Sequence, residues 1–229
     1  MNVMIFGATG MVGRSVLREC LISDEVHSVL SIGRQRTGQQ HDKLQEAELE
    51  DVSDLSSIEP LITGFDACFF CLGVSAVGMN EAEYKKVTYD ITLSAAKTLV
   101  GLNPRMTFIY VSGSGTDSTE KGRVMWAGIK GKTENDLLRL PFKAAYMFRP
   151  GVIIPTHGVK SKTKLYQAIY DLLKPFYPLL MKARSVITSE QLGNAMIKVA
   201  RDGHAHPILE SVDIKKAALS RRDDRIAEG

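Results

Sequence analysis

Three glycines follow directly on a short apolar run at the start of the chain, and this arrangement restricts the fold more than any other feature. Residues 2–6 are mostly apolar, which is typical of a buried parallel strand. Gly7, Gly10 and Gly13 come next, and apolar residues at helical spacing continue over residues 11–22. Such a strand, glycine turn and helix allow a tight turn and close packing of helix on strand.

The same turn predicts a phosphate site. Glycine lets the backbone approach a pyrophosphate closely, and the start of the following helix offers unpaired N–H groups and the positive end of its dipole. A tight turn without a ligand is the alternative. We expect a dinucleotide to contact Gly7, Thr9, Gly10, Met11 and Val12.

Apolar runs and amphipathic segments alternate along the rest of the chain. We expect strands over residues 26–32, 67–72, 106–111 and 144–148, and helices over residues 55–62, 84–100 and 124–138. Strands that alternate with helices are joined by crossovers into a parallel sheet with helices on both faces. The sequence therefore predicts an α/β fold, a doubly wound parallel sheet of the Rossmann type.

The composition changes after Pro155, where proline, lysine and bulky apolar residues crowd together. A chain of 229 residues suits one compact domain with an appendage better than two full domains. We therefore expect an NAD(P)-binding domain over residues 1–155 and a small C-terminal helical region over 156–229 that packs on it. Residues 187–192 predict an N-capped final helix with Ser189 as the cap.

Composition also bounds the location and the partners. No apolar run approaches the roughly 20 residues that span a bilayer, so no transmembrane segment is expected. The net charge of +3 is too weak to indicate nucleic acid. Three cysteines are too few for a disulfide scaffold and predict a cytoplasmic protein. His204 and His206 have only Glu210 nearby, so no metal site is expected.

Two arginines after the second expected strand bear on the choice of cofactor. An acidic residue there would hold a free ribose hydroxyl, whereas a basic one would accept a 2′-phosphate. The chain has Arg34 and Arg36, with no carboxylate before Asp42. Two guanidinium groups suit a phosphate dianion, so we expect NADP(H) rather than NAD(H). Two solvated surface arginines are the alternative.

Taken together, these motifs resemble the short-chain dehydrogenase/reductase superfamily in its atypical or extended branch, and within it the small oxidoreductase-like proteins related to the Tat-interacting protein. The likeness covers roughly residues 1–155. It rests on the glycine spacing, on residues 50–55, on Cys71-Leu72-Gly73, on residues 111–114 and on Arg149-Pro150-Gly151. The resemblance implies cofactor contacts at Asp51, Val52, Cys71, Leu72, Gly73, Ser112, Pro150, Gly151 and Val152.

The resemblance also implies a catalytic helix, and there the chain departs from the family. The family places tyrosine and lysine four residues apart, on one helix face; here the pair is Trp126 and Lys130. The resemblance implies that Lys130 grips the nicotinamide ribose and that Ser114, with Ser112 as the alternative, steadies the substrate oxygen. An indole N–H donates a hydrogen bond but does not ionise. Tyr84 is an alternative proton donor.

Two functions therefore remain open. The first is an NADP(H)-dependent oxidoreductase, or an epimerase- or dehydratase-like enzyme, acting on a small carbonyl or hydroxyl substrate. The second is a regulatory or scaffold protein that senses NADPH without turnover.

Residues 160–184 are basic, with apolar residues at helical spacing. They predict a lid helix over the substrate side, with a subunit interface or a membrane-surface contact as alternatives. The oligomeric state stays open. Cys68 and Cys71 have redox spacing, but three residues apart on a strand they point to opposite faces, so buried thiols are expected.

Overall fold

A computed structural model describes residues 1–157 and 183–219, and it has the predicted fold. Its main sheet has seven strands, all parallel, in the order β3-β2-β1-β4-β5-β6-β9. The first six follow the Rossmann order. The strands are β1 (Asn2–Phe6), β2 (Ser28–Gly33), β3 (Leu44–Glu48), β4 (Ala67–Phe70), β5 (Thr107–Val111), β6 (Ala144–Arg149) and β9 (Ile208–Glu210).

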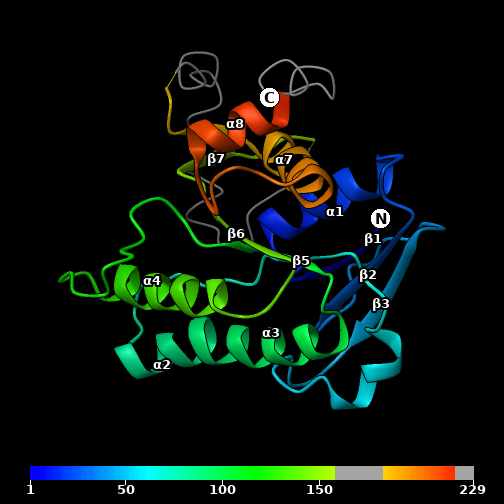
Figure 1. Cartoon of the computed structure of the whole chain (residues 1–229), viewed down its shortest axis with the longest axis horizontal. Helices are drawn as coiled ribbons and strands as arrows, with labels where there is room; N and C mark the ends of the chain where they lie inside the picture. The colour runs from blue at the N-terminus through cyan, green and yellow to red at the C-terminus, as the bar shows by residue number, and fades with distance from the viewer. Residues whose placement is uncertain (158–182, 220–229) are drawn as a thin grey trace.

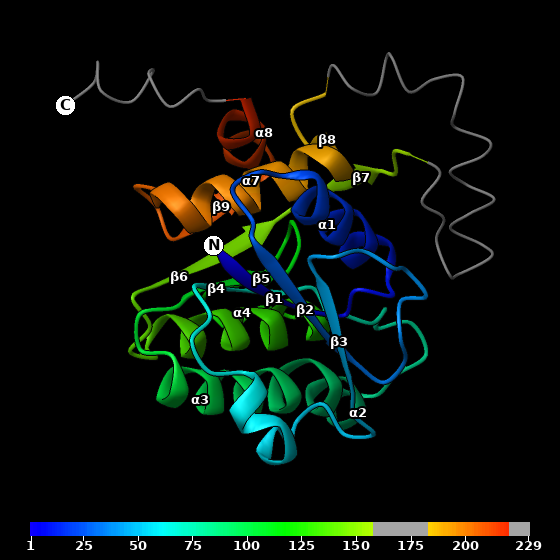
Figure 2. The ribbon, with the colours of Figure 1, turned by 90° about the vertical axis from the view of Figure 1, so that its right-hand side faces the viewer.

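Helices cover both faces of this sheet (Figures 1 and 2). One layer contains α1 (Met11–Ile22), α7 (Ser189–Asp202) and α8 (Ser211–Leu219); the other contains α2 (Glu81–Lys85), α3 (Ile91–Leu102) and α4 (Met125–Leu138). The side chains of β1 alternate between the two cores. Val3 and Ile5 pack with α1 and α7, whereas Met4 and Phe6 pack with α3 and α4. Burial on both faces explains why the strand is an unbroken apolar run.

The helix expected over residues 84–100 is longer and is not uniform. It runs through α2, a π-helical turn at Lys86–Asp90, and α3. It begins earlier than expected because Asn80 and Glu83 form a reciprocal capping box at its start. The helix expected over residues 55–62 is a 3-10 helix, Ser56–Leu61.

The segment after β6 completes the same sheet and helix layer. β7 (Val152–Ile154) pairs with β8 (Val186–Thr188), β9 extends the main sheet beside β6, and α7 packs beside α1. The predicted lid over 160–184 lies almost entirely outside the described residues and stays a prediction. Within residues 1–157 and 183–219, no helix is long and apolar enough to cross a membrane.

The predicted cap of the helix after β8 is wrong by one residue. Thr188 is the N-cap, and it shares a capping box with Gln191. Ser189 is the first helical residue, and its hydroxyl contacts Thr156 instead. This helix is not the final one either, because α8 follows it.

Helix α1 can lie against β1 only because residue 13 has no side chain. A Cβ on Gly13 would lie 2.1 Å from the carbonyl oxygen of Gly7. We therefore expect Gly13→Ala to lower the free energy of unfolding by about 3 kcal/mol or more, because backbone atoms would have to move. Urea denaturation followed by circular dichroism measures this loss.

Gly101→Ala is the matched control, because a Cβ on this helical glycine has no heavy atom within 4 Å. It should leave stability unchanged or raise it by about 0.5–1 kcal/mol, as is usual for alanine in a helix. Equal stability of the Gly13→Ala and Gly101→Ala proteins would contradict this account of how α1 is seated.

Candidate functional site

Two adjoining cavities lie at the carboxyl ends of the strands, where the strand order reverses between β1 and β4. This is where ligands bind in open parallel sheets. The larger cavity has a volume of about 560 Å³ and the smaller about 330 Å³. Leu72 lines both. Gly10, Met11 and Val12 line the larger cavity, and Gly7 and Thr9 the smaller.

The glycine turn leaves room for a ligand at the start of α1. Gly7 has a φ of 82°, a conformation that favours glycine, and Gly10 is an N-cap with no side-chain hydrogen bond. A Cβ on Gly10 would approach only the Gly7 carbonyl, and one on Gly73 would meet no heavy atom within 4 Å. A phosphate can therefore reach the first-turn N–H groups of α1, so the turn fits a dinucleotide.

The smaller cavity is lined by only some of the residues expected to contact the cofactor. Arg34 and Val52 line it, together with Gln35, which the sequence analysis missed. Arg36 is exposed beyond the lining. Neither arginine forms an ion pair with another described residue, so both guanidinium groups are available to an anion.

Asp51 does not line the smaller cavity. Its carboxylate accepts hydrogen bonds from the backbone N–H and the hydroxyl of Ser53, at 2.8 and 2.7 Å. These bonds lower the pKa of Asp51. The contact between Asp51 and a cofactor therefore has no support from the geometry, whereas the neighbouring Val52 is buried at the cavity wall.

The segment after β4 lines the larger cavity through Cys71, Leu72 and Gly73. Cys68 is buried in the core on the α3 side, whereas Cys71 packs against the opposite core. Burial raises the pKa of the Cys71 thiol to about 12 and also raises that of Cys68. Both thiols therefore stay protonated at neutral pH and are poor nucleophiles.

Lys130, Trp126 and Ser114 all line the larger cavity. The ammonium group of Lys130 donates a hydrogen bond to the backbone carbonyl of Ser112. Burial lowers the pKa of Lys130 to about 8, although the carboxylate of Glu134 acts in the opposite direction.

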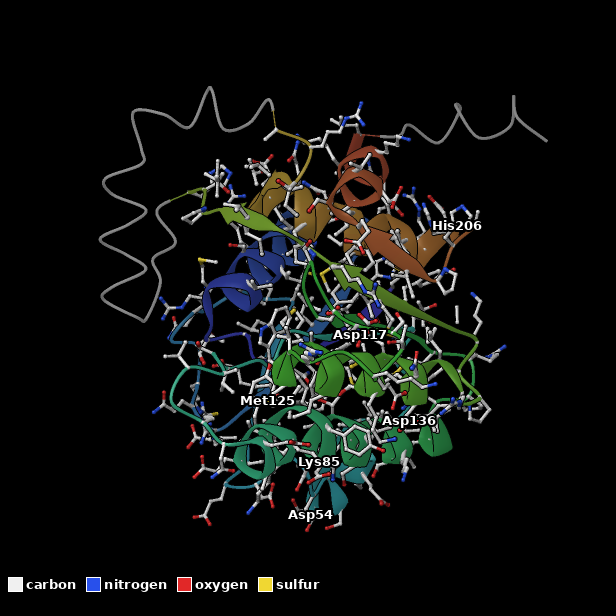
Figure 3. All side chains as sticks on the ribbon, turned by 90° about the vertical axis from the view of Figure 1, so that its left-hand side faces the viewer. Asp54, Lys85, Asp117, Met125, Asp136 and His206 are labelled. Carbon is white, nitrogen blue, oxygen red and sulfur yellow. The ribbon has the colours of Figure 1, made fainter. Side chains whose placement is uncertain are left out.

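The loop after β5 brings Ser114 to this wall, and the first turn of α4 brings Trp126. A Cβ on Gly115 would lie 3.4 Å from the indole of Trp126, so the ring lies against this glycine. Ser114 is exposed, and its N–H donates to the carbonyl of Pro150 at 2.9 Å. Further along, the backbone of the same loop packs against α4 at Asp117 (Figure 3). A Cβ on Gly131 of α4 would lie 1.7 Å from the Asp117 carbonyl oxygen, so only glycine fits there.

A buried charge network lies behind Lys130. Glu134 is fully buried, and both of its carboxylate oxygens accept hydrogen bonds from Arg149 Nε, at 3.0 and 3.1 Å. Burial alone would lower the pKa of Arg149, but its bonds to Glu134 raise it. The hydroxyl of Ser112 donates to Glu134 at 2.5 Å. Because this hydroxyl is occupied, Ser114 is the serine that is free to meet a substrate.

Two further expectations concern the cavity wall. Pro150 and Gly151 line the larger cavity, but Val152 does not: its side chain is 49% exposed, and Ile153 lines the cavity instead. Side chains alternate along a strand, so an error of one residue selects the wrong face. Tyr84, the alternative proton donor, is buried and outside the lining.

Val74, Val111 and Gly113 also line this wall and were not predicted as site residues. Val111 and Gly113 lie within the motif at residues 111–114, whereas Val74 lies outside every motif. Among the described residues, no group of three His, Cys, Asp or Glu side chains could hold a metal ion.

Comparison with known proteins now identifies the family. Residues 3–120 match the NAD dependent epimerase/dehydratase family. The chain belongs to this family. Its members have the Rossmann-type fold described above and bind NAD, so the predicted resemblance to NAD(P)-binding dehydrogenases is confirmed.

Named relatives match most of the chain. Protein fmp52-2, mitochondrial, from Aspergillus terreus is 28% identical over 227 residues, 96% of each chain. Protein HTATIP2 from Rattus norvegicus is 27% identical over 155 residues, 67% of this chain and 63% of its own. The Bordetella bronchiseptica enzyme WbmF, solved in complex with NAD⁺, has a TM-score of 0.65 at 14% identity, covering 94% of this chain and 76% of that one.

The expected cytoplasmic location is wrong. The fungal relatives are named as mitochondrial proteins, which contradicts it. The physical reason for the error is that few, unpaired cysteines indicate a reducing compartment without distinguishing one such compartment from another. Mitochondrial targeting uses a segment of its own kind, which a cysteine count does not reveal.

The Glu134–Arg149 pair generates a prediction about stability. Removing one partner of a buried ion pair leaves an uncompensated buried charge, which typically costs about 3–5 kcal/mol. We therefore expect Glu134→Gln to lower the free energy of unfolding by about that amount. Urea denaturation of the purified variant measures it.

Asp90→Asn is the control. Asp90 pairs with Lys85 at 3.3 Å, but both side chains are about half exposed, so the loss should stay below about 1 kcal/mol. If both variants lost the same free energy of unfolding, the buried Glu134–Arg149 pair would contribute no more to stability than the exposed Lys85–Asp90 pair.

Proposed function

We propose that the chain is an NADP(H)-dependent oxidoreductase of the short-chain dehydrogenase/reductase type that acts on a small carbonyl or hydroxyl compound. The observation that carries the proposal is that Trp126, Lys130 and Ser114 lie on the wall of one 560 Å³ cavity, next to a glycine turn that fits a dinucleotide.

The choice of NADP(H) rests on Arg34 and Arg36. Both are exposed, Arg34 in the lining of the smaller cavity and Arg36 two residues beyond it, and neither is engaged by a carboxylate among the described residues. A 2′-phosphate offers them charge-assisted hydrogen bonds that a ribose hydroxyl does not. No acidic side chain lines the smaller cavity to hold a free 2′-hydroxyl.

The nicotinamide of such a cofactor supplies or accepts a hydride. This chain's own groups would do the rest. The start of α1 would hold the pyrophosphate, Lys130 the ribose next to the nicotinamide, and Ser114 a substrate oxygen. Trp126 would form an apolar wall over the substrate and would stand where the family has its tyrosine.

A small substrate suits the described cavity. Val74, Trp126 and Ile153 give its wall an apolar part, and Ser114 and Lys130 give it two polar groups. Pockets of this kind orient a compact ligand through few polar contacts.

The second candidate function is NADPH sensing without turnover. It is favoured by one observation, that the indole of Trp126 cannot ionise. A library of aldehydes, ketones and alcohols, assayed through the absorbance of NADPH, separates the two candidates. Reproducible turnover of any compound by the wild type supports the enzyme, whereas none across the library supports the sensor.

The arginines predict a preference between the cofactors. A charge-assisted phosphate contact is worth about 1.5–3 kcal/mol, so NADPH should bind roughly ten- to a hundredfold more tightly than NADH. The Arg34→Ala, Arg36→Ala double variant should lose this preference and keep its affinity for NADH. Titration calorimetry gives all four dissociation constants.

Arg105→Ala serves as the control, because Arg105 is an exposed arginine outside both cofactor cavities. It should bind both cofactors as the wild type does. Equal affinity of the wild-type protein for NADPH and NADH would refute the assignment of NADP(H).

A further inference from the structure

If the chain reduces a carbonyl, a group at the cavity must give the substrate oxygen a proton. Among the described residues that line the larger cavity, only Cys71 and Lys130 can ionise. The thiol of Cys71 holds its proton too tightly, because burial raises its pKa to about 12. Lys130 is therefore the one ionisable group of this wall that can exchange a proton near neutral pH.

No tyrosine among residues 1–157 and 183–219 lines this cavity, so none of these fills the role. Tyr84 and Tyr110 are both almost fully buried, and neither lines the cavity. Burial also raises the pKa of both phenols, which makes them weaker acids. Trp126 reaches the cavity, but its indole keeps its proton.

We propose that Lys130 Nζ itself gives the proton to the substrate oxygen, in the role that a tyrosine fills elsewhere in the family. This inference rests on the proposed function. Lys130 would then be a catalytic residue as well as a cofactor contact.

One hydrogen bond holds Nζ at the cavity, and two further contacts hold its acceptor residue in place. The carbonyl of Ser112 accepts its hydrogen bond, and the hydroxyl of the same serine donates to Glu134, one helical turn after Lys130. Glu134 is in turn held by Arg149 of β6. The end of β5, helix α4 and β6 are thus joined around one amine.

The approach to this amine is open on one side. A Cβ on Gly113 would lie 3.8 Å from Nζ, and Gly113 has a φ of 148°, which favours glycine. A side chain at this position would lie against the amine. Its absence leaves space beside Nζ in the same cavity that Ser114 lines.

The charges around Nζ favour reversible proton transfer. Burial lowers the pKa of Lys130 to about 8, while Glu134 of the same helix attracts the charged form. Arg149 pairs its charge with Glu134, and the thiol of Cys71, which lines the same cavity, is neutral. At pH 7 the amine is mainly protonated, and its pKa is close to the working pH, as an effective general acid requires.

The step moves one proton. As the carbonyl carbon takes up the hydride that a reduced nicotinamide would supply, the electron pair of the C=O π bond moves to the oxygen. The N–H bond of the ammonium breaks and an O–H bond forms on that oxygen. The neutral amine keeps its lone pair and regains a proton from water. In the direction of alcohol oxidation, the neutral amine takes the hydroxyl proton.

The protonation of Lys130 can be measured without any activity. Trace labelling with acetic anhydride modifies only neutral amines, and mass spectrometry reads each lysine separately over a range from about pH 6 to 11. We expect half-maximal labelling of Lys130 near pH 8. Lys132 is the internal control, because its bond to Asp136 at 2.9 Å raises its pKa above the ordinary value. Labelling of Lys130 together with Lys132 would overturn the proposal.

Variants test the catalytic role. Lys130→Arg keeps the positive charge but does not release a proton at ordinary pH. It should bind NADPH within about threefold of the wild type, because the charge is kept, and lower kcat by about 10²–10⁴-fold. Lys132→Met should match the wild type in both measurements, because Lys132 faces Asp136 and Tyr89 rather than the cavity.

The pH dependence of the two rates shows which protonation state of Lys130 is active in each direction. Carbonyl reduction by the wild type should slow as the pH rises through about 8, because the ammonium form is lost, and alcohol oxidation should quicken over the same range. A Lys130→Arg protein that is as active as the wild type would overturn the proposal and leave the oxidoreductase function standing. A wild type without turnover on any compound would overturn both.

Discussion

The contact between Gly13 and the carbonyl oxygen of Gly7 is the constraint on which the site depends. No side chain fits between them, so the first turn of α1 lies directly on the end of β1. Gly7 is also close to the segment that follows β4, because a Cβ on it would lie 2.9 Å from the backbone nitrogen of Leu72. The ends of β1 and β4 and the start of α1 thus meet at one point, and the two cavities adjoin there.

A second constraint lies at the far side of the larger cavity. Ser112 uses its carbonyl to hold Lys130 and its hydroxyl to hold Glu134. Since Glu134 is buried and paired with Arg149, the helix that carries Lys130 cannot shift without exposing or separating these charges. A lysine fixed in this way can be both desolvated and accessible to a ligand. This combination is what the proposed acid–base role requires.

The sequence predicted the parts of the molecule whose signal is local. Apolar runs located β1, β4, β5 and β6, because strands buried on both faces are continuously apolar. The edge strand β3, Leu44–Glu48, carries mainly polar side chains and gave no such signal. β7, β8 and β9 are only three residues long, too short for any periodicity to be read.

The residues of the candidate site were likewise predicted only where their signal is local in the sequence. Glycine spacing and the tryptophan–lysine pair on α4 located cavity residues, because a turn and one helix face are set by neighbouring residues. Glu134 was missed, since a glutamate within a helix is typical of a solvated face and only tertiary packing buries it. Asp51 points to Ser53 through a local hydrogen bond that the resemblance did not foresee.

The most direct test of the whole account uses the single tryptophan of the chain. If the nicotinamide lies in the larger cavity, reduced cofactor will be close to Trp126, and its absorption overlaps indole emission. Titration with NADPH should therefore quench most of the intrinsic tryptophan fluorescence, in proportion to the sites occupied. Saturation with NADPH, verified by calorimetry, that leaves the emission unchanged would place the nicotinamide elsewhere and contradict the assigned site.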